Sequence, residues 1–176
     1  MDSAALRALQ APLKGRYKDE PAAALVTLRA QGAIDDVAVA CKVETGRALA
    51  IAGLHPATGG SGAELCSGDM LLEALVACAG VTLKAVATAL DIPLHAGTVK
   101  AEGDIDFRGT LGVAKDAPVG FREIRLAFEL DTDAAQDKVD SLVKLTERYC
   151  VVFQTLARPP KLAFAVARRP KVPDPG

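Results

Sequence analysis

Apolar and polar residues alternate along several short stretches of the first third of the chain, and this alternation predicts β-strands. Residues 24–34 could form a strand or a helix, and the alternation through the segment favours a strand. Residues 37–44 and 47–53 predict a β-hairpin, because Thr45-Gly46 between them is typical of a tight turn. A Gly-rich loop is expected at residues 55–68.

The long apolar segment in the middle of the chain predicts a helix. Ser67 or Asp69 is expected to cap this helix, which continues to about Leu90. Because the segment has hardly any polar stripe, we expect it to be buried on nearly all sides. It contains Glu73 and Lys84, and we interpret it as a buried helix rather than a membrane span.

The second half of the chain predicts two strands, a second helix with a helical continuation, and a last strand. In chain order these are residues 98–108, 121–130, 133–149, 151–157 and 161–167. Gly103 interrupts the apolar face of the first of these strands, so a bulge or a close backbone approach is expected there.

The resulting order, β-β-β-α-β-β-α-β, indicates an α+β fold rather than alternating βαβ units. We expect a main domain at residues 24–168, an N-terminal helical appendage at residues 1–23 and a flexible tail at residues 169–176. One layer of sheet in a small protomer cannot cover a helix that is apolar all round. A homodimer, in which a second copy covers the other side, is therefore expected.

Composition and charge narrow the choice of partners. Half of the residues are apolar and 24% are charged, which suits a folded domain with a sizeable core. The net charge is −1 and no long block of like charges occurs, so neither nucleic acid nor a membrane surface is an expected partner. The N-terminal segment is interrupted by charges and by Pro12, unlike the apolar region of a signal peptide, so a cytoplasmic, thiol-reduced location is expected.

The chain has four cysteines, Cys41, Cys66, Cys78 and Cys150, without a CxxC motif or a Cys/His pair at zinc spacing. No metal and no cofactor is therefore expected. Cys41 fits a core position in a strand.

The Gly-rich loop carries two further candidates. Cys66 is either a bystander or an extra thiol near the site, and His55 is either a surface residue or a base.

Cys78 and Cys150 are each flanked by apolar residues, so both can be interpreted as small core hydrophobes. A reactive cysteine is the alternative. The dipole of the central helix gives little help to Cys78, because that effect acts only in the first and last turns. A reactive Cys78 would therefore need a cation such as an arginine beside it to stabilise its thiolate.

The surroundings of these two cysteines resemble the OsmC/Ohr family. The resemblance lies in SGDMLLEALVACAGVTL around Cys78 and in ERYCVVFQTL around Cys150. The segments TVKAEGDIDFRG and FREIRLAFEL between them also fit the order of elements in that family. The resemblance covers roughly residues 24–168.

The resemblance implies a fold of antiparallel sheets around a long buried central helix, in an intertwined homodimer with two active sites at the subunit interface. It implies thiol-dependent reduction of organic hydroperoxides in oxidative-stress defence. Cys78 would attack the peroxide and become a sulfenic acid, and Cys150 would resolve it as a disulfide. A dithiol reductant, often a lipoyl group on a partner protein, would restore both thiols.

The chain departs from the family pattern at two positions. Gly68 stands where catalytic members often have a glutamate, Asp69 follows it, and Val151 stands where proline often follows the second cysteine. Arg47 is the candidate for the activating arginine, or a solvated turn charge. Asp69 is either its acidic partner or an acid that interacts with the helix dipole.

A function from another class is also consistent with the sequence. The chain could form a non-catalytic dimer of the same fold that binds a small apolar or thiol-bearing ligand. The two cysteines favour the enzyme, whereas Gly68 and the unassigned arginine favour the binding protein.

Overall fold

The computed structural model describes residues 2–5, 8, 10–11, 19, 31–34, 40–44, 49–112 and 114–168. Most of the expected N-terminal appendage, residues 1–23, lies outside this set, although the described residues 3–5, 8, 10–11 and 19 are helical. The expected tail, residues 169–176, and the candidate Arg47 also lie outside the described residues.

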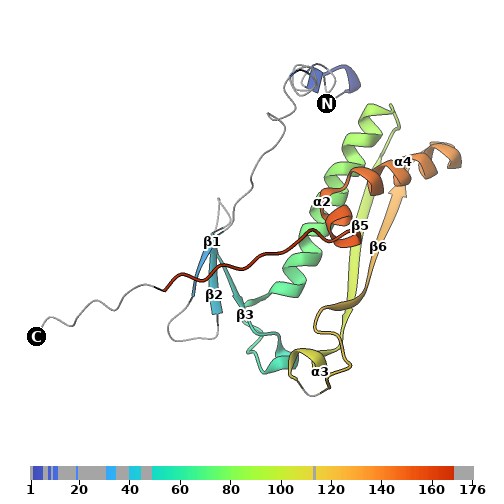
Figure 1. Cartoon of the computed structure of the whole chain (residues 1–176). Helices are drawn as coiled ribbons and strands as arrows, with labels where there is room; N and C mark the ends of the chain where they lie inside the picture. Colours follow the sequence, from blue (N-terminus) through green and yellow to red (C-terminus); the bar gives the residue numbers. More distant parts are fainter. Residues whose placement is uncertain are drawn as a thin grey trace, which may run out of the picture.

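The central helix, α2, spans Ser67–Ala89 and is the longest described element (Figure 1). The prediction that Ser67 or Asp69 caps it is wrong. Cys66 is the N-cap residue, with extended backbone angles (φ −82°, ψ 131°), and its side chain makes no capping hydrogen bond. Ser67 is already helical, and Asp69 lies in the first turn, where a carboxylate interacts favourably with the helix dipole.

One stripe of α2 is buried within the single chain. This stripe consists of residues at intervals of four, which pack against the strands and helices that follow α2 in the chain: Leu75, Ala79, Leu83 and Ala87. Outside this stripe, apolar side chains such as Val81, which is 73% exposed, remain open to solvent. The single chain thus does not bury the helix on all sides. By length and composition alone, α2 could also cross a membrane, a test that core helices of soluble proteins pass too.

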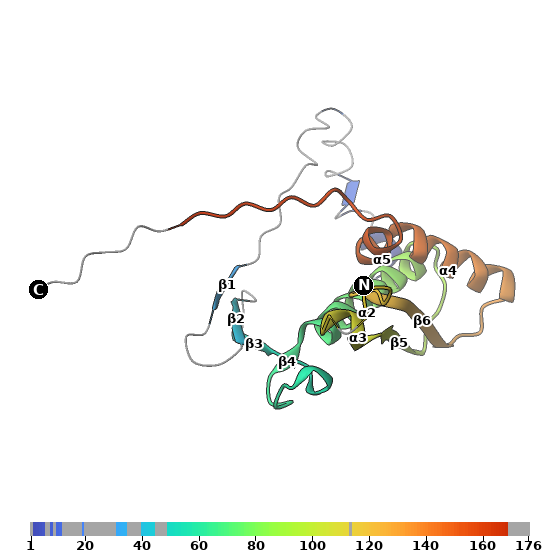
Figure 2. The same ribbon diagram turned by 60° about the horizontal axis from the view of Figure 1, so that its bottom comes forward.

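Strands β5 (Ala96–Ile105) and β6 (Phe121–Asp131) form an antiparallel ribbon along α2 (Figures 1 and 2). Their apolar side chains pack toward the helix, and their charged side chains face away, as period-two alternation requires. The register shifts between Asp104 and Ile105. A Cβ at Gly103 would lie 2.4 Å from Cε1 of Phe121. The expected bulge is thus found just after Gly103, whereas the close approach to Gly103 is made by the Phe121 ring and not by a backbone segment.

The strand predicted at residues 98–108 is too long at its C-terminal end. Asp106 instead caps a short helix, α3 (Phe107–Thr110), because its carboxylate accepts a hydrogen bond from the backbone N–H of Arg108 at 3.2 Å. The Arg108 guanidinium beside Asp106 lowers the pKa of that carboxyl to about 2. Local side-chain chemistry therefore ends the strand before its apolar alternation does.

Two helices close the described fold, as the sequence predicts. Helix α4 spans Gln136–Tyr149 and α5 spans Val151–Ala157. Cys150 alone separates them, with extended backbone angles (φ −71°, ψ 107°) that end one helix and begin the next. Leu142 of α4 is fully buried in a cluster with Leu83, and this contact fixes α4 against α2.

A second, four-stranded sheet has the order β1 (Gln31–Ile34), β2 (Ala40–Glu44), β3 (Leu49–Gly53), β4 (Leu65–Cys66). The antiparallel pairing of β2 with β3 confirms the predicted hairpin, whose turn residues lie outside the described set. The short β4 was not predicted. It pairs in parallel with β3 and leads directly into α2, after the loop that holds the 3-10 helix η2 (Pro56–Thr58).

The last strand predicted at residues 161–167 is not formed in the single chain. This segment leaves α5 as an extended, exposed trace (Figure 1). Leu162, Phe164 and Val166 alternate as a strand would and are 81–95% exposed. A strand needs the backbone of a neighbouring strand, and the described part of the chain provides none for this segment.

Candidate active site

Cys78 and Cys150 come together where the break between α4 and α5 meets the middle of α2. Cys150 belongs to a buried cluster with Leu75 and Ala79, and Cys78 packs against that cluster. Cys150 is only 1% exposed, whereas Cys78 is half-buried, and both are free thiols. Of the sequence candidates, these are the two that the described structure brings into contact.

The surroundings of Cys78 favour its ionised form. Burial by itself would raise the pKa of this thiol. Hydrogen bonds from the backbone N–H of Val152, the thiol of Cys150, the backbone N–H of Val151 and the hydroxyl of Thr82 outweigh burial, so the pKa of Cys78 lies below its ordinary value. Among the described residues, no cation contributes to this shift.

The surroundings of Cys150 favour its protonated form. Burial is the main cause and raises the pKa of this thiol. The backbone N–H groups of Phe153 and Val152 oppose the shift, and the interaction with Cys78 adds to it. When the pair loses one proton, these opposite shifts favour ionisation at Cys78 over Cys150. This asymmetry is the electrostatic property that a nucleophile and a resolving thiol require.

Sequence reasoning missed the groups that stabilise the Cys78 thiolate. Val151 and Val152 lie in the first turn of α5, whose N–H groups have no partner within their own helix. In the sequence, Cys150 is followed by the apolar Val151, and this pair of residues does not predict a break between two helices. Thr82 is four residues after Cys78, and that spacing on a predicted helix places the two on one face.

Asp69 and Cys78 are not brought together within one chain. They are nine residues apart on α2, which separates them by about 13.5 Å along the axis and half a turn around it. Asp69 lies near the start of the helix, where it borders a cavity with Leu72 and Asp104.

The same cavity, of about 330 Å³, holds the other candidates of the Gly-rich loop, His55 and Cys66. His55 stacks on Phe107 with ring centroids 4.8 Å apart, and its Nδ1 accepts a hydrogen bond from Ala57. Cys66 lies about 18 Å along α2 from Cys78. Within one chain, neither residue is part of the Cys78–Cys150 site.

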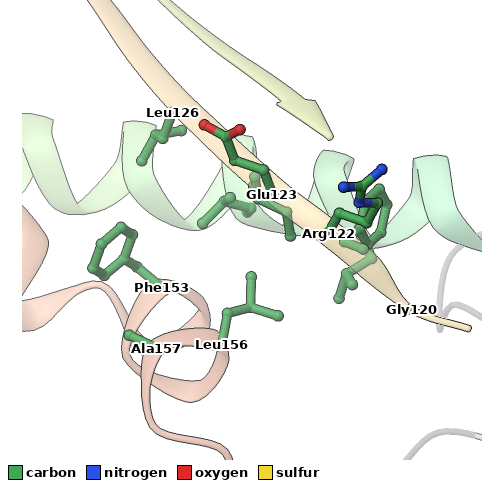
Figure 3. Close-up of a pocket in the computed structure, with 11 residues that line it drawn as sticks. Gly120, Arg122, Glu123, Leu126, Phe153, Leu156 and Ala157 are labelled. Atoms are coloured by element: carbon green, nitrogen blue, oxygen red, sulfur yellow. The ribbon is translucent and has the colours of Figure 1, made fainter. Parts of the chain in front are cut away.

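A largely apolar cavity of about 550 Å³ lies close to the cluster that holds the thiol pair, and Figure 3 shows the residues that line it. It lies between α2, β6 and α5, and Arg122 and Glu123 are its charged lining residues. Phe153 and Leu156 of α5 point into it (Figure 3). Phe153 and Leu75 border this cavity and also pack in the cluster around Cys150, so the cavity and the thiols share a wall.

No group of three or more His, Cys, Asp or Glu side chains is arranged to hold a metal ion among the residues that the structure describes. The chemistry that the described groups can perform is that of two adjacent thiols. Cys78 has a lowered pKa and is partly accessible, and Cys150 is buried and has a raised pKa.

Comparison with known proteins places this arrangement in a family. The family described as OsmC-like protein matches residues 60–165, which is more than half of the chain and includes both cysteines. The chain therefore belongs to the OsmC-like protein family, and the resemblance noted in the sequence is confirmed. A comparison with curated proteins finds no match.

Solved structures of OsmC-like proteins share the α+β fold. An OsmC-like protein from Mycoplasma pneumoniae is 16% identical, with a TM-score of 0.64 over 76% of this chain and 89% of its own. An organic hydroperoxide resistance protein OsmC from Legionella pneumophila is 17% identical, with a TM-score of 0.59 over 77% and 92%. An organic hydroperoxide resistance protein from Elizabethkingia anophelis is also 17% identical. Its TM-score is 0.59, and the match covers 77% of this chain and 90% of its own. At these identities the likeness establishes the fold.

Proposed function

We propose that this protein is a thiol-dependent peroxidase that reduces organic hydroperoxides and thereby contributes to defence against oxidative stress. The observation that carries the proposal is the pairing of Cys78, whose pKa is lowered, with Cys150, whose pKa is raised. Membership of the OsmC-like family supports it, as do structural neighbours named as organic hydroperoxide resistance proteins.

The proposed first step uses the thiolate of Cys78. Its sulfur attacks one oxygen of the hydroperoxide, the O–O bond breaks, and the alkoxide leaves with a proton as an alcohol. Cys78 becomes a sulfenic acid. The thiol of Cys150 then attacks that sulfur, the hydroxyl leaves as water, and a Cys78–Cys150 disulfide forms. The peroxide gains the two electrons that the thiol pair loses.

A dithiol completes the proposed cycle by returning two electrons to the disulfide, and a lipoyl group on a partner protein would serve. No metal or cofactor is needed for these steps. We propose a cytoplasmic location, where thiols are kept reduced. Neither nucleic acid nor a membrane is a proposed partner.

We further propose that the working unit is an intertwined homodimer in which the second copy covers the exposed side of α2. Exposed apolar residues on two separate elements support this proposal. Val81 on α2 is 73% exposed, and the strand-like segment with Phe164 extends away from its own chain. Asp69 of one chain can approach the Cys78 of another only in such an assembly.

In this dimer, Arg47 is proposed as the cation beside Cys78 and Asp69 as its acidic partner. Gly68 leaves the chain without the longer glutamate that the family often has there. A shorter acid one residue later can still pair with an arginine, at a different distance from the thiol.

A second candidate function is favoured by the apolar cavity beside the thiols. At about 550 Å³, it has the size of a small-molecule site. A non-catalytic member of the fold could hold an apolar or thiol-bearing ligand there. In the enzyme, the same cavity would receive the apolar part of an organic hydroperoxide.

Thiol titration separates the two functions. Reduced protein is mixed with a small excess of cumene hydroperoxide, and free thiols are counted against time. The peroxidase should lose two thiols per chain, those of Cys78 and Cys150, and dithiothreitol should restore both. A protein that keeps all its thiols while binding the hydroperoxide is the binding protein.

A further inference from the structure

We propose that the reducing thiol attacks Cys150 rather than Cys78, and that it reaches Cys150 through a small cavity between α4 and β6. This inference rests on the proposed function, because it concerns the return of the disulfide to two thiols. In this proposal the peroxide reacts with the sulfur of Cys78, and the reductant reacts with the sulfur of Cys150 from a different side.

The geometry of the α4–β6 cavity carries the inference. It has a volume of about 150 Å³, and Cys150 is part of its wall. The remaining lining residues come from β6, α4 and α5: Leu126, Phe128, Val143, Thr146, Glu147 and Phe153. Cys78 lies on α2 and does not line this cavity. A small molecule in it therefore lies beside Cys150 and not beside Cys78.

The lining also selects the kind of molecule that enters. Glu147 is its charged residue, and the other side chains are apolar apart from the Thr146 hydroxyl. That hydroxyl donates to the backbone oxygen of Leu142, so it is already paired. The cavity thus suits a slender aliphatic thiol whose carbon chain bears no carboxylate or other charged group, such as one arm of a dithiol.

The chemistry of thiol–disulfide exchange points to the same sulfur. The attacking thiolate bonds to one sulfur of the disulfide, and the second sulfur leaves as a thiolate. The reaction is faster when the leaving sulfur belongs to the thiol of lower pKa. The pKa of Cys78 is lowered, and that of Cys150 is raised. Attack on Cys150 releases Cys78 as a thiolate among the N–H groups of Val151 and Val152 that already stabilise it.

A thiolate of the reductant forms a new S–S bond with Cys150, and the Cys78–Cys150 bond breaks with its electron pair on Cys78. The second thiol of the dithiol then attacks the reductant's own sulfur and closes a cyclic disulfide. Cys150 leaves as a thiolate and takes up a proton. The dithiol loses two electrons, and the two cysteines gain them.

The mixed disulfide identifies the attacked sulfur. Full-length protein with Cys41 and Cys66 replaced by serine is oxidised with diamide, so that the disulfide forms without any peroxide. It is treated with the monothiol 2-mercaptoethanol, quenched with N-ethylmaleimide, and mapped by peptide mass spectrometry. Mercaptoethanol should be found on Cys150 and maleimide on Cys78. The reverse pattern would overturn the proposal.

A cavity variant tests the route of access. Val143→Phe should narrow the cavity. The control is Val119→Phe, because Val119 is 65% exposed and lies outside the cavity. Dithiothreitol should reduce the disulfide about tenfold more slowly in Val143→Phe than in the control. Val143→Met should show a smaller effect in the same direction. Equal rates for all three proteins would remove the cavity as the route. If peroxide does not oxidise the protein but both exchange results hold, the proposed function fails and the access route stands.

Discussion

The thiol of Cys150 lies against the sulfur of Cys78, and each changes the ionisation of the other. Cys150 stabilises the thiolate of Cys78, whereas Cys78 helps to keep Cys150 protonated. The two residues come from opposite halves of the domain and meet because α2 packs against both α4 and α5. The proposed reaction depends on this relationship, since only a pair in contact can pass from sulfenic acid to disulfide without rearranging the fold.

The first prediction concerns the pH at which Cys78 becomes reactive. Because its pKa is lowered, iodoacetamide should alkylate Cys78 with an inflection at lower pH than for a cysteine in a short peptide. Thr82→Val removes one hydrogen-bond donor to the thiolate and should move that inflection to higher pH. The measurement is the rate of alkylation against pH in protein with Cys41 and Cys66 replaced by serine.

Thr88→Val is the matched control for this prediction. Thr88 lies on the same helix, but its hydroxyl donates to the backbone oxygen of Lys84. The inflection should therefore stay where it is in the unchanged protein. If both threonine variants shift it equally, the hydrogen bond from Thr82 does not stabilise the thiolate.

The second prediction concerns the ribbon that supports α2. Gly103→Ala forces its new methyl group against the ring of Phe121 and should lower the free energy of unfolding by about 1–3 kcal/mol. Gly80→Ala meets only Val99, at 3.6 Å, and should raise it by about 0.5–1 kcal/mol, because alanine favours the helix. Urea unfolding followed by circular dichroism measures both. Two variants of equal stability would show that the Phe121 ring moves freely aside.

The third prediction concerns the homodimer. Phe164→Asp places a charge on the exposed strand-like segment, which we propose to be covered by the second copy, and should shift the mass in light scattering from two chains toward one. Lys115→Asp, at an exposed residue before β6, should leave the mass unchanged. A protein that is monomeric at micromolar concentration before any substitution would contradict the assembly itself.

The fourth prediction concerns Arg47. If Arg47 supplies the cation for Cys78, Arg47→Gln should slow the reaction of Cys78 with cumene hydroperoxide and raise the pH of its alkylation inflection. Arg158→Gln, at an exposed residue that ends α5, is the control. No change in either quantity would leave the N–H groups of α5 and the Thr82 hydroxyl as the groups that stabilise the thiolate.

The sequence predicts the elements of this fold well wherever local patterns determine them. The period-two alternation of β5 and β6, the continuous apolar residues of α2 and the helical pattern of α4 are all readable along the chain. The pairing of Cys78 with Cys150 came from the resemblance to a family rather than from periodicity. Their contact depends on tertiary packing between α2 and the α4–α5 break.

The errors arise where a local or tertiary interaction overrides the pattern. Asp106 ends a strand by capping a helix, although apolar alternation continues to Phe107. Cys66 takes the N-cap position although Ser67 and Asp69 are better capping residues. The alternation at Leu162, Phe164 and Val166 is present, but a single chain gives this segment no neighbouring strand.

The most direct test of the two-cysteine account replaces each cysteine by serine and measures the consumption of cumene hydroperoxide. Cys78→Ser should consume none, because no activated thiolate remains. Cys150→Ser should consume one equivalent and stop at a sulfenic acid on Cys78, which dimedone traps and further peroxide over-oxidises to the sulfinic acid. If Cys150→Ser is inert and Cys78→Ser yields the trapped adduct, the roles are reversed. If both variants turn over like the unchanged protein, the two-cysteine mechanism is wrong.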